Sequence, residues 1–140
     1  MRVFLDTNVL ASAASTRGIC ADILREVFAS HQLIISEQVV EELRWVLANK
    51  FGVPNDHLEE FVWLLHQDTI VAQPSESAPV RLRDESDIPI VSAALNAKAD
   101  VFVTRDKGIQ NLGQIGPLRV LSPRQFWEKL RTQLDASEEE

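Results

Sequence analysis

The chain has 140 residues, of which 45% are hydrophobic and 25% are charged, and its formal net charge is −7. These proportions are typical of globular proteins and exclude collagen-like, disordered and disulfide-scaffold chains. A single cysteine, Cys20, cannot form an internal disulfide, no secretory leader opens the sequence, and no apolar run is long enough to cross a bilayer. We therefore expect a cytoplasmic protein without a membrane segment, built as one domain over 1–134 and ending in an acidic disordered tail over 135–140.

The negative charge is spread unevenly along the chain. Four of the 21 acidic side chains lie in the last six residues, so the rest of the chain has 17 acidic and 14 basic residues, a net charge of −3. A field of this sign argues against a protein that binds nucleic acid through its overall charge. Divalent cations held by several carboxylates would invert the field locally, so the net charge does not exclude a nucleic-acid substrate.

Short apolar strands alternate with amphipathic helices in the first half of the chain. We expect strands at 3–5, 33–35 and 69–72, and helices at 21–29, 36–49 and 56–66. Thr7 and Asn8 are typical of a turn after the first strand. Ser36 is expected to cap the helix over 36–49, and Asp56 with Glu59 resembles a capping box.

The second half continues the alternation. A Ser- and Pro-rich loop over 74–79 precedes a helix that begins at Asp87, strands follow at 101–103 and 118–121, and Ser122-Pro123-Arg124-Gln125 opens a final helix. This order predicts a three-layer α/β/α domain, in which helices cover both faces of a central, mainly parallel sheet.

Three acidic residues are predicted to share one edge of this sheet. Asp6 ends the first strand, Asp106 lies three residues beyond the strand over 101–103, and Asp87 stands at a helix start that faces the same way. Ligands of parallel sheets bind beyond the carboxyl ends of the strands, where the next helices begin. This edge is therefore the predicted functional site.

The helix over 36–49 adds a fourth acidic residue near that edge. Its apolar stripe places Glu42 on the flank toward the sheet and Glu41 nearly opposite, toward solvent. We favour Glu42, and Glu41 remains the alternative.

Four carboxylates in one pocket repel one another unless cations or raised pKa values offset their charge. Mg²⁺ or Mn²⁺ prefers oxygen ligands, and one or two such ions can activate a water and neutralise a phosphodiester during hydrolysis. Asn8 and Thr104 could supply neutral hydrogen bonds to the carboxylates or the substrate. The predicted chemistry is phosphodiester hydrolysis.

These residues resemble the PIN domain ribonucleases in motif order and spacing. The resemblance covers roughly the first 110 residues and rests on Val3-Phe4-Leu5-Asp6-Thr7-Asn8, Val39-Val40-Glu41-Glu42-Leu43, Asp84-Glu85-Ser86-Asp87 before Ile90-Val91-Ser92-Ala93-Ala94-Leu95, and Val103-Thr104-Arg105-Asp106. It implies a PIN-like fold and metal-dependent endoribonuclease activity. The catalytic metal ligands would be Asp6, Glu42, Asp87 and Asp106, with Asn8 and Thr104 in supporting positions.

The resemblance also implies partners. Many bacterial members of this family resemble toxins of toxin–antitoxin modules that a small antitoxin holds inactive. Basic residues near the predicted site are few, chiefly Arg105 and Lys107, and these are the candidate RNA-binding side chains. We also expect a two-fold homodimer that uses the helix over 56–66, with Phe61 and Trp63, and Trp45 on the neighbouring helix.

Other interpretations remain open for the same residues. Taken singly, Asp6 could be a turn former, Asp87 a helix cap and Asp84 a loop acid. Asp6 after an apolar strand also suits the nucleophile of an aspartate-based phosphatase or phosphotransferase, but such sites want a second aspartate where this chain has Asn8. A third possibility is a non-catalytic PIN-like protein that only binds a partner.

Overall fold

The computed structural model describes residues 1–74, 82 and 84–139, so residues 75–79 of the expected Ser- and Pro-rich loop lie outside it. The elements in chain order are β1 (Arg2–Leu5), α1 (Thr7–Ser15), α2 (Ile19–Ser30), β2 (Gln32–Ser36), α3 (Glu37–Asn49), α4 (Asn55–Leu65), β3 (Ile70–Ala72), the 3₁₀ turn η1 (Glu85–Asp87), α5 (Ile88–Asn96), β4 (Val101–Val103), α6 (Lys107–Gln110), β5 (Gln114–Ile115), β6 (Leu118–Leu121) and α7 (Pro123–Glu139).

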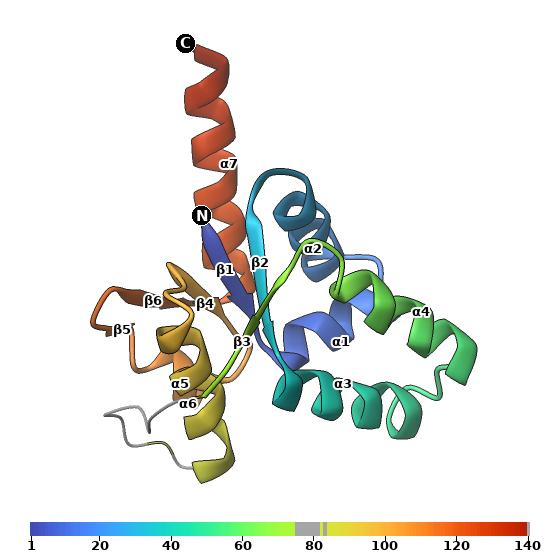
Figure 1. Cartoon of the computed structure of the whole chain (residues 1–140). Helices are drawn as coiled ribbons and strands as arrows, with labels where there is room; N and C mark the ends of the chain where they lie inside the picture. Colours follow the sequence, from blue (N-terminus) through green and yellow to red (C-terminus); the bar gives the residue numbers. More distant parts are fainter. Residues whose placement is uncertain (75–81, 83, 140) are drawn as a thin grey trace.

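The strands form one sheet in the order β3-β2-β1-β4-β6-β5. β1 lies between β2 and β4 and pairs with both in parallel, whereas the short edge strand β5 pairs antiparallel with β6. Figure 1 shows α1 to α4 on one side of the sheet and α5 on the other. The predicted α/β/α architecture with a mainly parallel sheet is confirmed.

The topology creates a switch point between β1 and β4. The chain moves from β1 to β2 and then β3 on one side, and it returns to the other side of β1 to form β4. Open α/β sheets bind ligands in the crevice beyond the carboxyl ends of strands at such a point. Asp6 follows β1 there, and Thr104 follows β4.

Aromatic packing holds these two strands together below the crevice. The rings of Phe4 and Phe102, on paired positions of β1 and β4, stack with centroids 5.1 Å apart and planes 7° from parallel. Both side chains are fully buried. Strands covered on both faces are continuously apolar, and this is why the short run over 3–5 could be recognised as a strand.

The helix α1 was not predicted. Asp6 accepts a hydrogen bond from Thr7 N, and the backbone N–H groups of Val9 and Leu10 bond back to Asp6 O, so the helix begins directly after β1. The Ala- and Ser-rich sequence of α1 carries a narrow apolar stripe that periodicity alone does not reveal. The turn expected at Thr7 and Asn8 is therefore the first turn of a helix.

The sequence predicts capping boxes at the starts of α4 and α7, and the structure contains only the second. Asp56 does not cap α4, contrary to the prediction, because α4 begins at Asn55 after Pro54 and no side chain caps it. At the start of α7 the predicted reciprocal capping is present: Ser122 Oγ accepts from Gln125 N at 3.1 Å, and Ser122 N donates to Gln125 Oε1 at 2.9 Å.

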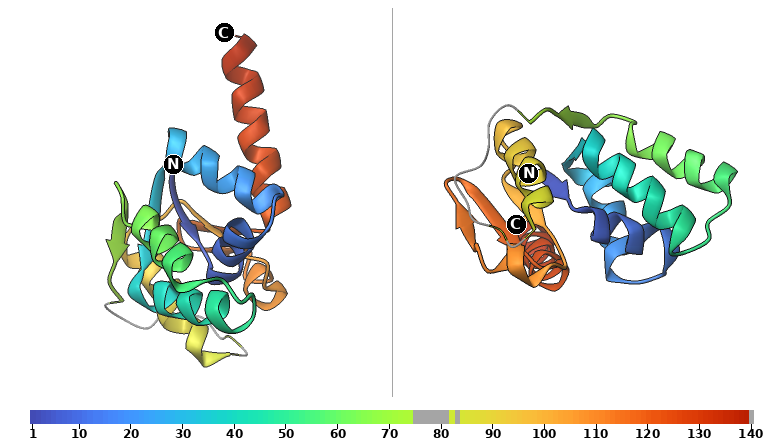
Figure 2. Two further views of the ribbon diagram at one scale, coloured as in Figure 1. Left: turned by 90° about the vertical axis from the view of Figure 1, so that its right-hand side faces the viewer. Right: turned by 90° about the horizontal axis from the view of Figure 1, so that it is seen from below.

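The helix α7 continues to Glu139, although a disordered tail was expected from 135. Residues 133–139 are mostly good helix formers, so nothing in the local sequence ends the helix earlier. Phe126 and Leu130 are buried near the body, and Figure 2 shows the distal part of α7 extending away from it. Within residues 1–74, 82 and 84–139, no helix combines the length and apolar character needed to cross a membrane.

Candidate active site

Asp6 stands at the centre of the switch point, between the end of β1 and the start of α1, with only 4% of its surface exposed. Its Oδ1 accepts a hydrogen bond from Thr7 N at 2.8 Å. Its Oδ2 accepts from Thr104 Oγ1 at 2.8 Å and from Asn8 Nδ2 at 3.3 Å. Both oxygens of this buried carboxylate are therefore held by neutral donors.

Thr104 and Asn8 join the ends of β1 and β4. Thr104 Oγ1, which is fully buried, donates to Asp6 and accepts from Asn8 Nδ2 at 3.3 Å and from Asp106 N at 3.0 Å. Asn8 Oδ1 accepts from Arg105 N at 3.0 Å. The structure thus places Asn8 and Thr104 in contact with the acidic residues, as the sequence analysis expected.

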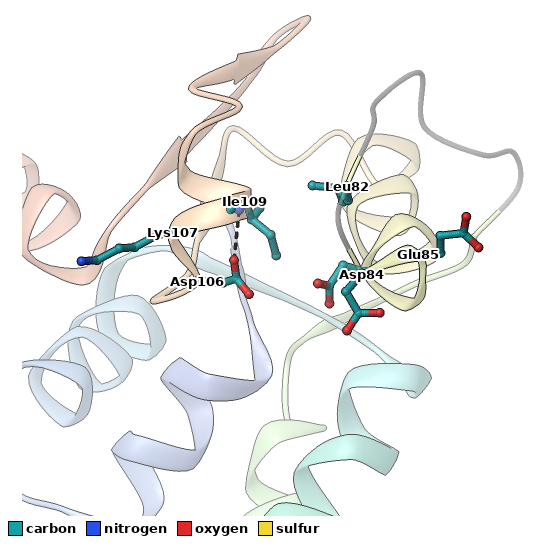
Figure 3. Close-up of a pocket in the computed structure, with 8 residues that line it drawn as sticks. Leu82, Asp84, Glu85, Asp106, Lys107 and Ile109 are labelled. Carbon is teal, nitrogen blue, oxygen red and sulfur yellow. Dashed lines mark hydrogen bonds between the residues drawn. The ribbon is translucent and has the colours of Figure 1, made fainter.

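Asp106 lies at the start of α6, and its Oδ1 accepts from Ile109 N at 3.1 Å (Figure 3). A Cβ atom at position 108 would stand only 3.1 Å from this same oxygen, so glycine at that position leaves room for the carboxylate. The hydrogen bond from Ile109 N fixes the orientation of the Asp106 carboxylate beyond the carboxyl end of β4.

Glu42 reaches the site from α3. Its Oε2 accepts from Thr7 Oγ1 at 3.0 Å, and its Oε1 accepts from Gln38 Nε2 at 3.3 Å. Gln38 also donates to Ser86 O at 2.9 Å and so links α3 to the turn η1. Glu41 is exposed, which agrees with the helix rotation inferred from the sequence.

Asp87 occupies the N-cap position of α5, but its side chain makes no capping hydrogen bond. Asp84 makes the local bonds instead, because its Oδ1 accepts from Ser86 N at 3.0 Å and from Ser86 Oγ at 2.7 Å. These bonds lower the pKa of Asp84. The interpretation of Asp87 as a helix cap is therefore not supported by its contacts.

One pocket of about 390 Å³ brings the four predicted acids together. Its lining includes Asp6, Glu42, Asp87, Asp106 and Arg105. A neighbouring pocket of about 770 Å³ shares Asp87 and Asp106, and its lining also includes Asp84 and Lys107. Figure 3 shows the Lys107 side chain extending away from the acidic side of this second pocket.

Burial and mutual repulsion raise two pKa values in this cluster. Burial is the main cause of the raised pKa of Asp6, its hydrogen bonds to Thr104 and Thr7 oppose the rise, and the charges of Glu42 and Asp106 add to it. The pKa of Asp87 is raised to about 6, chiefly by burial and next by the charge of Asp6. The site is therefore poor in positive charge and favours a cation or a proton.

The donor chemistry of the pocket fits a hard divalent cation, since four carboxylates line it. In the part of the chain that the structure describes, however, no three His, Cys, Asp or Glu side chains stand close enough to hold one ion as placed. Binding would require the carboxylates to draw closer, which their repulsion opposes until a cation is present.

Several residues of the site were missed by the sequence analysis. Thr7 and Gln38 bind Glu42, and Lys50 and Phe51 line the same pocket at the far end of α3. Gln38 and Glu42 are four positions apart, as are Val46 and Lys50, so helical spacing could have indicated their shared face. Thr7 could be found only by predicting α1.

We expect Asp87→Asn to stabilise the metal-free protein at pH 7. A carboxyl group whose folded pKa is raised from 3.8 to about 6 contributes stability below pH 4 that is lost as the pH rises through 6. The gain should be about 1 kcal/mol, since solvent screens this half-buried group, and it should disappear near pH 4. Urea unfolding in EDTA at both pH values measures it, with the exposed Glu60→Gln as the control; equal destabilisation at both pH values would contradict the repulsion argument.

Comparison with solved structures finds proteins that are similar to this chain in fold. The chain is similar to VapBC2 from Rickettsia felis bound to a DNA fragment from their promoter, with a TM-score of 0.62 and 15% identity over 87% of this chain and 98% of that chain. It is also similar to VapC20 from Mycobacterium tuberculosis, a sarcin–ricin loop cleaving toxin, with a TM-score of 0.59 and 13% identity over 84% of this chain and 98% of that chain.

At these identities the solved structures support the fold alone, and a comparison with curated proteins finds no match. The sequence model of the PIN domain, by contrast, matches residues 2–108, which include all four acidic residues of the pocket. This match spans well over half of the chain, and the chain therefore belongs to the PIN domain family.

Proposed function

We propose that this PIN domain protein is a metal-dependent endoribonuclease and the toxin component of a toxin–antitoxin module. The observation that carries the proposal is the convergence of Asp6, Glu42, Asp87 and Asp106 on one pocket at the switch point of the sheet. Membership of the PIN domain family and the similarity to a toxin that cleaves the sarcin–ricin loop support it. The proposed partner is a small antitoxin, in keeping with the family resemblance.

The four carboxylates would hold Mg²⁺ or Mn²⁺, which supplies an activated water and offsets the charge of the phosphodiester. Thr104 and Asn8 keep Asp6 oriented through their hydrogen bonds. Thr7 and Gln38 do the same for Glu42. Arg105 lines the pocket and is the better placed of the two proposed RNA-binding cations, because Lys107 lines only the neighbouring pocket.

The contacts of Asp6 argue against the phosphatase alternative. Such an enzyme would need its second aspartate at position 8, whereas Asn8 there donates from its side-chain amide to Asp6 Oδ2 at 3.3 Å. The four acids that a metal site needs are all present at the pocket, which favours a catalytic protein over a purely partner-binding one.

We expect Asp6→Asn and Asp106→Asn each to reduce hydrolysis of total cellular RNA by orders of magnitude in Mg²⁺ or Mn²⁺. Each change removes a negative ligand while keeping the side-chain size, so the loss should track metal binding. Gel assays with and without EDTA measure the effect, and the exposed Asp56→Asn serves as the control. Full turnover in EDTA would refute metal dependence.

Glu42 and Glu41 provide a matched pair within one helix. Because only Glu42 lines the pocket, Glu42→Gln should weaken metal binding by about ten-fold or more, whereas Glu41→Gln should leave metal binding and hydrolysis nearly unchanged. Parallel titrations with Mn²⁺ measure this difference. Equal losses in the two variants would show that both acids serve the site.

We also propose a two-fold homodimer through α3 and α4. Trp45 on α3 and Trp63 on α4 are 58% and 65% exposed, although large aromatic side chains are normally buried in a protein or an interface. We expect light scattering to give the mass of a dimer for the native chain and of a monomer for the double variant Trp45→Ser/Trp63→Ser. A native chain that is monomeric at high concentration would remove this proposal.

A further inference from the structure

The pocket that contains Asp6 continues past the four carboxylates, along the line where α1 packs against α3. This part, which we call the α1–α3 arm, is lined on the α1 side by small and hydroxyl-bearing residues and on the α3 side by an apolar, a basic and an aromatic residue: Ala11, Ser12, Ser15, Thr16, Val46, Lys50 and Phe51. None of these residues holds the carboxylates in place, so the arm has no role in the site described so far.

The α3 side of the arm changes character along a single helix face. Glu42, Val46 and Lys50 are spaced by four residues, so they lie on one face, and all three line the pocket. The backbone rise from Glu42 to Lys50 is about 12 Å. Over this length the lining changes from acidic to apolar to basic, which suits a ligand that is anionic beyond its metal-bound group.

The cations of the pocket are not neutralised by the protein. Within residues 1–74, 82 and 84–139, neither Lys50 nor Arg105 forms a side-chain ion pair, whereas Arg25, Arg44 and Arg124 each pair with an acidic residue. The Lys50 side chain is therefore available to pair with an anion in the arm.

Phe51 closes the far end of the arm with 51% of its surface exposed. It follows the last turn of α3, and Gly52 reverses the chain next to it with a φ of +61°, a conformation that favours glycine. Phe51 thus stands next to a defined backbone turn at the pocket rim. An aromatic face there can stack on a nucleobase of any sequence.

The hydroxyl groups on the α1 side can act as hydrogen-bond acceptors. Ser15 Oγ donates to Ala11 O at 2.7 Å, and Thr16 Oγ1 donates to Ser12 O at 2.7 Å. Their protons are therefore used within α1, and Ser12 Oγ, 3.3 Å from Thr16 Oγ1, donates to that oxygen and occupies one of its lone pairs. The lone pairs of Ser15 Oγ and the second lone pair of Thr16 Oγ1 remain for amino or hydroxyl donors of a ligand.

We propose that the α1–α3 arm binds the nucleotide next to the scissile phosphate of a single-stranded RNA, with the base stacked on Phe51 and its phosphate paired with Lys50. The inference rests on the proposed ribonuclease function and assigns the substrate path on one side of the site. The apolar Val46 and the aromatic ring meet the base, the hydroxyl oxygens of α1 face the sugar edge, and the carboxylates at the other end meet the scissile group.

The test uses the full chain with Asp6→Asn, which removes hydrolysis, and a fluorescein-labelled single-stranded RNA octamer in Mg²⁺. Phe51→Ala and Phe51→Leu should raise the Kd by about ten-fold, whereas Phe51→Trp should keep the native affinity, because leucine preserves apolar volume without a stacking face. Lys50→Gln should lower the slope of log K against log salt concentration by about 0.7, the value for one phosphate contact on a single strand.

Matched controls separate this site from the general surface. Leu134→Ala removes an exposed apolar side chain and Lys129→Gln removes a lysine, both on α7 and outside the pocket; both variants should leave the Kd and the salt slope unchanged. With an otherwise native chain, Phe51→Ala should raise KM and leave kcat within about two-fold, the pattern of a contact made equally in the ground and transition states.

The outcomes distinguish this inference from the proposed function. Native affinity in Phe51→Leu, or an unchanged salt slope in Lys50→Gln, would overturn the inference. A protein partner would then be the remaining candidate ligand of the arm. The cleavage of total cellular RNA by the native chain is a separate test of the ribonuclease function. An octamer that does not bind at low salt would overturn the assignment of the arm even if such cleavage is observed.

Discussion

The hydrogen bond from the buried Thr104 hydroxyl to Asp6 is the contact on which the site depends. It spans two residues that are 98 positions apart and joins the ends of β1 and β4 at 2.8 Å. Burial disfavours the charged form of Asp6, and this bond is the largest of the effects that oppose it. The same hydroxyl accepts from Asp106 N, so a single neutral group sets the positions of two acidic residues.

Helix starts explain how carboxylates can gather at this edge without a cation. Asp6 precedes α1 and accepts from the first free N–H group of that helix, so the positive end of the helix dipole partly offsets its charge. Asp87 stands before α5 but makes no such bond, and burial together with repulsion raises its pKa to about 6. The pKa values of both acids are therefore raised, and only that of Asp6 is opposed by local hydrogen bonds.

The sequence was sufficient for every strand of the sheet except β5 and for placing the four acids at one edge of it, because both depend on local rules. Apolar runs mark the buried strands, the edge beyond their carboxyl ends follows from parallel topology, and helical rotation distinguishes Glu42 from Glu41. It was insufficient for α1, whose apolar stripe is narrow, and for Thr7, whose contact with Glu42 depends on that helix. Phe51 was missed because its position depends on the turn at Gly52 rather than on a periodic pattern.

The proposed RNA binding has to proceed against a net charge of −3 over residues 1–134 and of −7 over the whole chain. A negative body repels a polyanion at long range, so affinity has to arise from contacts inside the pocket rather than from electrostatic attraction to the whole surface. The pocket is lined by Lys50 and Arg105, which form no side-chain ion pair within the described residues, and by the exposed aromatic ring of Phe51. Short-range contacts distinguish substrates by their fit to the pocket more than by their charge. Repulsion by a negatively charged protein weakens the binding of any RNA that does not make these contacts, and so increases the difference in affinity between substrates.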